Sequence, residues 1–188
     1  MQQNIRSSQT KTMILEAANR LLQKAGSEGF TLEAVAAEAR VSKGGLLYHF
    51  ASKNALIEGM IARSIKRVDE ALAEELEREN GNYLKAYIRA SFRTTADSEQ
   101  VSRAFIAAIA RNPALLDPLR ERFERMQREI VAHAPSKEFG TLVRLAMDGL
   151  WFTELYHFAP PPVELRNKLQ ELLLALSSEQ NSQEGKSK

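Results

Sequence analysis

The sequence predicts an all-α protein of about nine helices, and three observations favour this fold class. Alanine, the aliphatic residues, glutamate and arginine dominate the composition. Glycine and proline are few, at 9 and 6 of 188 residues. No run of alternating apolar residues is flanked by turn dipeptides, as a strand would be. A chain of this length suits a small N-terminal helical domain joined to a larger C-terminal one.

The spacing of apolar residues and the positions of glycine and proline predict the bounds of the helices. The first four are expected at about residues 10–25, 32–39, 43–50 and 53–79. Five more are expected at about residues 83–96, 99–111, 113–132, 136–158 and 162–177. The polar segments 1–9 and 178–188 are expected to be disordered. The domain boundary is placed within the long fourth helix, between residues 10–55 and 56–177.

Composition and charge exclude several classes of protein. The chain has no cysteine, which excludes disulfides, thiol catalysis and cysteine-ligated metal sites. No eighteen apolar residues run together, and the polar N-terminus lacks a signal-peptide core, so a soluble, cytoplasmic protein is expected. Residues 1–53 hold seven Lys and Arg against four Glu, while the whole chain carries only +2. This excess is equally compatible with ordinary surface charge and with nucleic-acid binding.

Neither catalysis nor metal binding is predicted. The three histidines, His49, His133 and His157, are far apart and lack metal-ligand spacing. Glycine-rich phosphate loops and nucleophile motifs are missing as well. We therefore expect a protein that is not an enzyme and needs no cofactor.

Residues 31–50 have the pattern of a helix-turn-helix. Thr31 and Ser42 are good N-caps for two short helices joined by a short turn, the arrangement that places the second helix in the major groove of DNA. Leu46, Leu47 and Phe50 have the spacing of residues that turn toward a core.

The remaining residues of the second helix, Lys43, Gly44, Tyr48 and His49, are expected to face outward. Gly44 and Gly45 each cost a helix about 1 kcal/mol relative to alanine. Close approach to the backbone of another molecule would explain this pair of glycines.

The segment FTLEAVAAEARVSKGGLLYHFASKNAL, residues 30–56, resembles the DNA-binding region of the TetR family of transcriptional repressors. The matching positions are Thr31, Ala36, Val41, Ser42, Leu46, His49, Phe50, Ser52, Lys53 and Leu56. The resemblance covers residues 10–60, and it extends to the rest of the chain only as a helical architecture.

This resemblance implies that Thr31, Ser42 and Lys53 hold phosphates, and that Lys43, Gly44 and His49 lie at or near the groove. Hydroxyls and lysines are phosphate partners in their own right, and Lys43 can donate to guanine acceptors. The alternative is that Thr31 and Ser42 only cap helices and that the lysines are solvated.

Two positions depart from the family pattern. Arg40 stands where the family usually has a glycine with a left-handed backbone, which costs about 1 kcal/mol of strain and offers a further phosphate contact. Tyr48 follows Leu47, the position where the family commonly has tyrosine. We include Tyr48 among the DNA-contacting residues, but its role is not carried over.

Dimerisation is expected through the last two helices. Residues 139–158 are apolar almost all round, so both sides should be buried. In the TetR family the last two long helices of each subunit form a four-helix dimer interface, and the resemblance implies the same here. The candidate interface residues are Leu142, Leu150, Leu165, Leu169, Leu172, Leu173 and Leu176. The alternative is a monomer with a central buried helix.

An effector pocket in the second domain is implied by the family. The candidate lining residues are Phe92, Phe105, Phe123, Met126, Trp151 and Tyr156. Arg122, Asp148 and Glu154 could orient a polar ligand. The alternative is that the apolar residues are plain core and the three charged residues are solvated.

The sequence thus predicts a homodimeric, ligand-responsive transcriptional repressor that binds a palindromic operator in double-stranded DNA. One alternative is a helical adaptor or ligand carrier whose hairpin contacts protein. Another is an enzyme with a helical-bundle active site. Salt-sensitive binding to DNA would distinguish the repressor from both.

Overall fold

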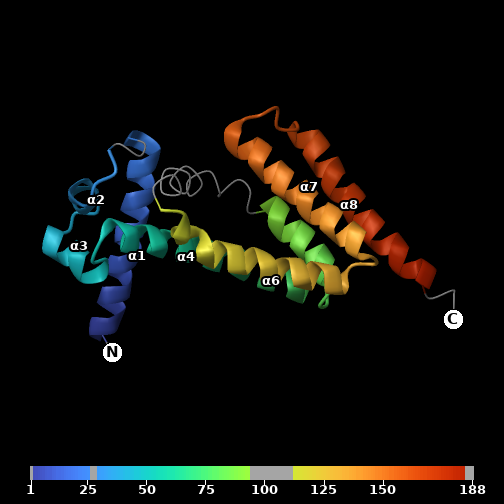
Figure 1. Cartoon of the computed structure of the whole chain (residues 1–188), viewed down its shortest axis with the longest axis horizontal. Coiled ribbons are helices and arrows are strands. Elements are labelled where there is room, and N and C mark those ends of the chain that lie inside the picture. Colours follow the sequence, from blue (N-terminus) through green and yellow to red (C-terminus); the bar gives the residue numbers. More distant parts are fainter. Residues whose placement is uncertain (1, 26–28, 94–111, 185–188) are drawn as a thin grey trace. The chain divides into compact units, whose positions relative to one another are not determined.

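The computed structural model describes residues 2–25, 29–93 and 112–184, and these residues are almost entirely helical (Figure 1). The labelled elements are α1 (Gln2–Ala25), α2 (Leu32–Glu38), α3 (Lys43–His49), α4 (Lys53–Arg78), the 3-10 helix η1 (Pro113–Leu116), α6 (Asp117–His133), α7 (Lys137–Tyr156) and α8 (Val163–Glu184). A further helix covers residues 83–93. The part of the chain that is described contains no strand, and the predicted all-α fold is confirmed. The helix expected at residues 99–111 lies outside the described residues.

Residues 2–9 and 178–184, the described parts of the two terminal segments that were expected to be disordered, are helical. α1 begins at Gln2, and no glycine or proline interrupts residues 2–9. Thr10 does not cap this helix, because its hydroxyl donates to the Arg6 carbonyl within it, at 2.9 Å. α8 continues to Glu184, since the hydroxyls of Ser177 and Ser178 likewise donate back to carbonyls one turn earlier.

The described residues form two compact units. The first unit contains α1, α2, α3, α4 as far as Ile65, and η1. The second contains α4 from Lys66, the helix at residues 83–93, most of α6, and α7 and α8. The division falls inside α4, later than the expected boundary after residue 55. No helix among the described residues is long and apolar enough to cross a membrane.

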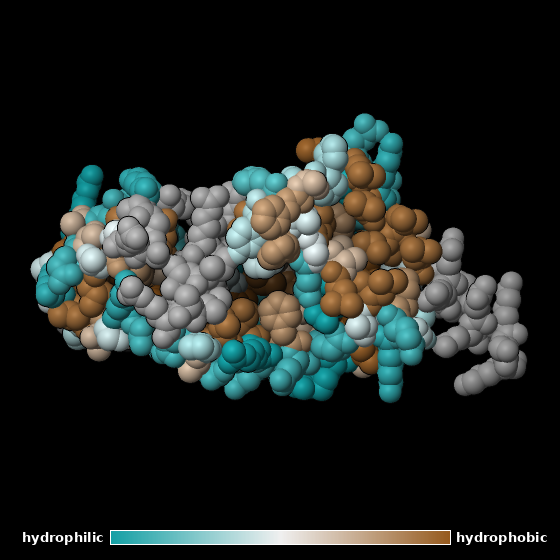
Figure 2. Space-filling model, turned by 45° about the horizontal axis from the view of Figure 1, so that its top comes forward, coloured by the Kyte–Doolittle hydropathy of each residue, from teal (hydrophilic) through white to brown (hydrophobic). Residues whose placement is uncertain are grey.

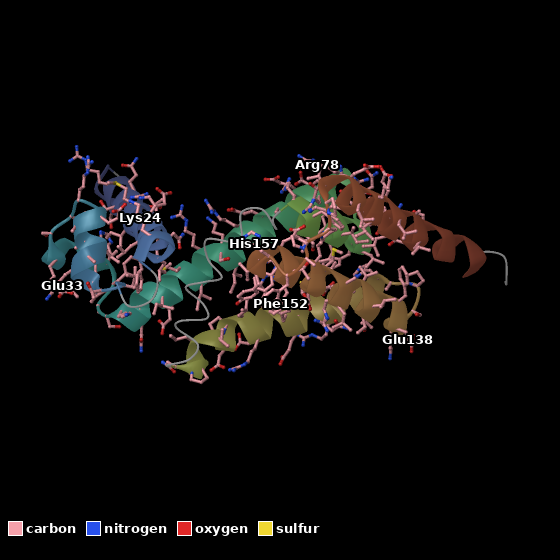
Figure 3. The ribbon with its side chains drawn as sticks, turned by 90° about the horizontal axis from the view of Figure 1, so that it is seen from above. Lys24, Glu33, Arg78, Glu138, Phe152 and His157 are labelled. Atoms are coloured by element: carbon pink, nitrogen blue, oxygen red, sulfur yellow. The ribbon has the colours of Figure 1, made fainter. Side chains whose placement is uncertain are left out.

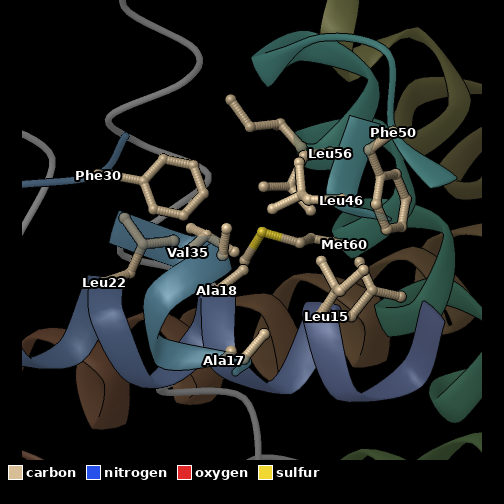
Figure 4. Close-up of a cluster of buried hydrophobic side chains, with 14 of the residues drawn as sticks. Leu15, Ala17, Ala18, Leu22, Phe30, Val35, Leu46, Phe50, Leu56 and Met60 are labelled. Atoms are coloured by element: carbon tan, nitrogen blue, oxygen red, sulfur yellow. The ribbon is translucent and has the colours of Figure 1, made fainter. Parts of the chain in front are cut away.

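The first unit packs α2, α3 and α4 against one face of α1 (Figure 4). Ile14, Leu46 and Leu56, from three different helices, are fully buried. Gly59 of α4 lies so close to Phe50 that a Cβ atom there would be 2.5 Å from the Phe50 ring. This core therefore fixes the position of α3 through its middle, at Leu46, and its C-terminal end, at Phe50.

The second unit has a separate core. Its buried members come from the helix at residues 83–93, α6 and α7, and they are Leu84, Tyr87, Ile88, Phe92, Met126, Ile130, Val143 and Met147. Gly140 of α7 faces Ala134 and Ile130 at distances that leave no room for a Cβ atom. Small size at residue 140 thus lets the start of α7 pack closely on the end of α6.

Candidate nucleic-acid interface and effector site

The short helices α2 and α3 are held by N-caps at their first turns. Oγ1 of Thr31 accepts a hydrogen bond from the Ala34 amide at 3.1 Å, and Oγ of Ser42 accepts one from the Gly45 amide at 3.0 Å. Both caps have extended backbone, as N-caps do. The predicted caps are confirmed, and their oxygens are engaged as acceptors.

The turn between α2 and α3 is a Schellman motif with arginine at the left-handed position. The Val41 amide donates to the Ala36 carbonyl at 3.0 Å, and the Arg40 amide donates to the Ala37 carbonyl at 3.1 Å. Arg40 has a φ of 56°, which glycine adopts without cost and arginine does not. The left-handed conformation expected at Arg40 is therefore present, and its side chain is exposed.

One face of α3 is buried and the other is exposed. Leu46 and Phe50 reach into the core, one helical turn apart. Leu47 was expected to join them, but this prediction is wrong, because its side chain is 36 % exposed. It follows Leu46 directly, so it points about 100° further round the helix, away from the core.

The exposed face of α3 carries Lys43, Gly44 and Tyr48. Tyr48 is 81 % exposed, and its ring meets the half-buried ring of His49 edge to face at 5.1 Å. No atom outside the local backbone lies within 4 Å of where a Cβ of Gly44 would be. Lys43, Gly44 and Tyr48 thus lie on the exposed side of the helix together with Leu47, and the half-buried His49 lies at its edge.

Lys43 is joined to α2 by an ion pair that the sequence pattern did not reveal. Its Nζ lies 2.7 Å from Oε1 of Glu33, and both side chains are well exposed. The hydrogen bond from Lys43 lowers the pKa of the Glu33 carboxyl below its ordinary value. A search for i, i+4 charge pairs could not find this contact, because the two residues lie on different helices.

Lys53 is bound more tightly to the protein than a simple phosphate contact would require. Its Nζ donates to the Phe30 carbonyl at 2.6 Å and lies 5.2 Å from the centre of the Phe30 ring. The side chain is half-buried. Lys53 therefore joins the start of α4 to Phe30, the residue before the N-cap of α2.

The candidate effector residues are only partly brought together. Phe92 and Met126 are buried in the core of the second unit. Phe123 and Trp151 are exposed at its surface. Tyr156 packs against Phe152 and Phe158 near the end of α7, and Phe105 lies outside the described residues.

The three charged candidates in this unit, Arg122, Asp148 and Glu154, form ion pairs. Arg122 is buried and its Nε donates to Asp69 at 2.9 Å. Asp148 pairs with Arg144 at 2.5 Å, and Glu154 pairs with Arg166 at 2.7 Å. The alternative that these side chains are simply solvated is therefore wrong.

Burial shifts the acidity of two groups beside this network. It raises the pKa of Asp148, and the neighbouring Arg144 opposes the shift. Burial also raises the pKa of the Tyr87 hydroxyl, with the charge of Asp148 acting in the same direction. Among the described residues, no group of three or more His, Asp or Glu side chains is arranged to hold a metal ion.

The candidate interface leucines divide into two sets. Leu150, Leu169 and Leu173 pack against the core of the second unit. Leu142, Leu165, Leu172 and Leu176 are exposed, with Leu142 at 62 % and Leu172 at 54 %. Figure 2 shows hydrophobic side chains gathered on the surface over α7 and α8.

Further apolar side chains on these two helices and in the loop between them are exposed, although they were not among the candidates. They are Leu145, Phe152, Phe158 and Val163. Figure 3 labels Phe152 and His157 near the end of α7, where His157 ends the helix in a left-handed conformation with a φ of 55°. The near-continuous apolar character of residues 139–158 could have indicated these residues, apart from Val163.

Two protein-family models match the chain. Residues 14–60 match the family described as bacterial regulatory proteins, tetR family. Residues 81–178 match the family described as tetracyclin repressor-like, C-terminal domain. The second match alone covers more than half of the 188 residues.

Solved structures with the same fold include several regulators. A member of the TetR family from Streptomyces coelicolor A3 superposes with a TM-score of 0.68 at 20 % identity, covering 87 % of this chain and 97 % of that one. The multidrug binding protein EbrR complexed with malachite green has a TM-score of 0.66 at 20 % identity, covering 89 % and 97 %. At this identity the similarity shows the fold.

Among curated proteins, an uncharacterized HTH-type transcriptional regulator of Mycobacterium bovis is 28 % identical over 129 residues. A regulator of Mycobacterium tuberculosis described in the same words matches equally. The match covers 67 % of this chain but only 61 % of the relatives' length.

Proposed function

The chain belongs to the TetR family of bacterial regulatory proteins, and on this basis we propose that it is a transcriptional regulator that binds operator DNA. The observation that carries the proposal is α3. Its buried side, Leu46 and Phe50, is fixed in the core, while Lys43, Gly44 and Tyr48 stand together on the open side. This division is what a recognition helix in the major groove requires.

In this proposal Lys43, Gly44, Tyr48 and His49 face the groove. Lys43 and Tyr48 are the long exposed donors, and Gly44 adds no side chain that would keep the helix away from DNA. Guanine presents two acceptors in the major groove, which suit a lysine ammonium.

Thr31, Ser42 and Lys53 contact phosphates and set the register of the protein on DNA. Each of the two hydroxyls accepts a bond through its oxygen and retains its proton for a phosphate. A lysine ammonium has three N–H donors, of which the Phe30 carbonyl takes one. A phosphate contact by Lys53 is therefore compatible with its bond to Phe30.

The regulator acts as a homodimer through α7 and α8. The support is the exposed apolar surface of Leu142, Leu165, Leu172 and Leu176, which is unfavourable in water and resembles the interior of an obligate interface. Leu150, Leu169 and Leu173 lie beneath it as its support. A two-fold dimer would present two α3 helices about 34–36 Å apart to a palindromic operator.

Effector binding in the second unit regulates DNA binding, most simply as relief of repression in the cytoplasm. The support is the multidrug binding of EbrR, together with a unit whose aromatic residues stand beside paired charges. The proposed lining is Phe92, Phe105, Phe123, Met126, Trp151 and Tyr156. The effector would tilt α4 and change the spacing of the two α3 helices. This requires the effector to bind the dimer with one spacing more tightly than the dimer with the other.

The proposal is tested by binding the purified full chain to the DNA upstream of its own gene and of the neighbouring genes. We expect binding that weakens steeply as salt rises, because phosphate contacts release counterions. Lys43→Ala should weaken this binding. Binding that is absent, or that is insensitive to salt and to Lys43→Ala, would contradict the proposal and favour a helical adaptor.

A further inference from the structure

The ion pair between Glu33 and Lys43 joins the two helices of the helix-turn-helix on its exposed side. Oε1 of Glu33 and Nζ of Lys43 are 2.7 Å apart, and the two side chains are 63 % and 60 % exposed. Figure 3 labels Glu33 at the outer surface of the first unit. A carboxylate thus accompanies the lysine on the surface proposed to meet DNA.

An acid at this place is unfavourable for binding DNA in general. A carboxylate near phosphates is repelled, and its negative charge offsets the attraction of the paired lysine for a phosphate. The other paired acid of α2, Glu38, has a different setting. It is half-buried and pairs with Arg20 and Lys24 of α1, where it braces two helices.

The Glu33–Lys43 pair is too exposed to be explained as a brace. Exposed ion pairs contribute little to stability, because water screens both charges. The cores and caps already hold α2 and α3 in place through residues such as Val35, Leu46, Thr31 and Ser42. The pair therefore calls for a role at the surface itself.

We propose that Glu33 is a specificity-determining residue that, together with Lys43, reads a G·C base pair of the operator and disfavours other DNA. This inference rests on the proposed DNA-binding function. The pair presents a donor and an acceptor side by side. A G·C pair presents the complementary set in the major groove, with the O6 and N7 acceptors of guanine beside the N4 donor of cytosine.

At the operator, Lys43 donates to guanine and Glu33 accepts from cytosine, so both charges retain hydrogen-bond partners. On DNA that places no donor at that position, the carboxylate is left without a hydrogen-bond partner and is repelled by the phosphates. A glutamate carboxyl is ionised at neutral pH, and the hydrogen bond from Lys43 lowers the pKa of Glu33 further. Glu33 thus reduces non-specific affinity and raises the ratio of specific to non-specific binding.

The test is selection of binding sites from a pool of random-sequence duplex DNA with the wild-type full chain and with Glu33→Gln. We expect wild type to select a site containing a defined G·C pair. Glu33→Gln should lose the exclusive preference at that pair alone, because a glutamine amide also pairs with adenine. Affinity for unrelated duplex should rise in the variant, and the specificity ratio should fall about tenfold. The logarithm of the non-specific binding constant should fall more steeply with the logarithm of salt concentration, by the amount expected for about one additional phosphate contact.

Glu16→Gln is the matched control. Glu16 also forms a 2.7 Å exposed ion pair in the first unit, with Arg63, but this pair joins α1 to α4. Glu16→Gln removes the same charge as Glu33→Gln but changes no residue of α2 or α3. The site that it selects and its specificity ratio should therefore match those of wild type. Circular dichroism and thermal unfolding establish that both variants are folded.

Each outcome is decisive. Loss of the preference at one G·C pair in Glu33→Gln, with Glu16→Gln unchanged, supports the role of Glu33. A variant that selects the wild-type site with an unchanged ratio overturns it, while leaving the DNA-binding function intact. Equal changes in both variants overturn it too, because they would reflect net charge. If wild type selects no site and binds no duplex, the proposed function itself fails.

Discussion

The ammonium of Lys53 donates a hydrogen bond to the carbonyl oxygen of Phe30, 2.6 Å away, and so ties the first turn of α4 to the entry of α2. The Phe30 side chain below it is buried in the core of the first unit. Lys53→Met keeps the apolar stem of the side chain but removes this bond. We expect the free energy of unfolding to fall by about 1–2 kcal/mol, as measured by urea denaturation.

Lys66→Met serves as the reference for this prediction. Lys66 is highly exposed and pairs with Glu70 on the same helix at 3.4 Å. Its replacement should change stability by less than about 0.5 kcal/mol. Equal stability of Lys53→Met and wild type would show that the bond to Phe30 contributes nothing.

Arg40→Gly should stabilise the protein. Arg40 has a φ of 56°, and glycine removes the steric cost of that conformation. The free energy of unfolding should therefore rise by about 1 kcal/mol. Gly81 provides the reverse test, because its φ is 83° and its surroundings are open. Gly81→Ala should destabilise by a similar amount. A destabilising Arg40→Gly would mean that the arginine side chain outweighs the strain.

Gly44→Ala should separate folding from DNA binding. A Cβ at this position meets nothing within 4 Å in the free protein, and alanine favours a helix by about 1 kcal/mol over glycine. Thermal unfolding should therefore occur at a higher temperature. Operator affinity, measured by fluorescence anisotropy, should fall by about tenfold, or about 1.4 kcal/mol, because the methyl group stands between α3 and the DNA. An unchanged affinity would refute close approach at Gly44.

Gly59→Ala should damage the core of the first unit. The added Cβ would be 2.5 Å from Cε1 of Phe50, so the ring must move within a closely packed cluster. We expect a loss of about 1–3 kcal/mol in urea denaturation. Gly149→Ala is the comparison, since a Cβ there meets nothing within 4 Å and should be neutral or stabilising. Similar behaviour of the two variants would refute the steric explanation.

Leu172→Glu should dissociate the proposed dimer. The side chain is 54 % exposed in the single chain, so the variant should fold, but a carboxylate in an apolar interface is strongly disfavoured. Light scattering after size-exclusion chromatography should give a monomer for Leu172→Glu and a dimer for wild type. Glu171→Gln, a change at the adjacent exposed residue, should leave the dimer intact. A monomeric wild type would remove the basis for the α7–α8 interface.

Much of the fold could be predicted because helix ends in this chain have local causes. Thr31 and Ser42 cap their helices through their own side chains, and Asn80 and Gly81 end α4 with left-handed backbone. The termini were mispredicted for the converse reason. Polar composition at residues 2–9 and 178–184 suggested disorder, yet no residue in these segments ends a helix.

The candidate site was less predictable where contacts join distant residues. The exposed side of α3 followed from helical spacing, with the error confined to Leu47. The pairing of Glu33 with Lys43, and of Lys53 with the Phe30 carbonyl, depends on how separate helices pack. The candidate interface leucines of α8 were also hard to assign. Some of them pack on the core and others are exposed, and only the packing of the helices shows which side of α8 is buried.

The exposure of Tyr48 has a consequence for how this regulator can change over generations. At 81 % exposure, its side chain contributes almost nothing to the packing that holds α3. Substitutions there alter what the helix presents while Leu46 and Phe50 keep it in place. With α3 in its proposed position in the major groove, operator preference can therefore diverge one exposed residue at a time without loss of the fold. Duplicated copies of such a gene can then acquire separate targets.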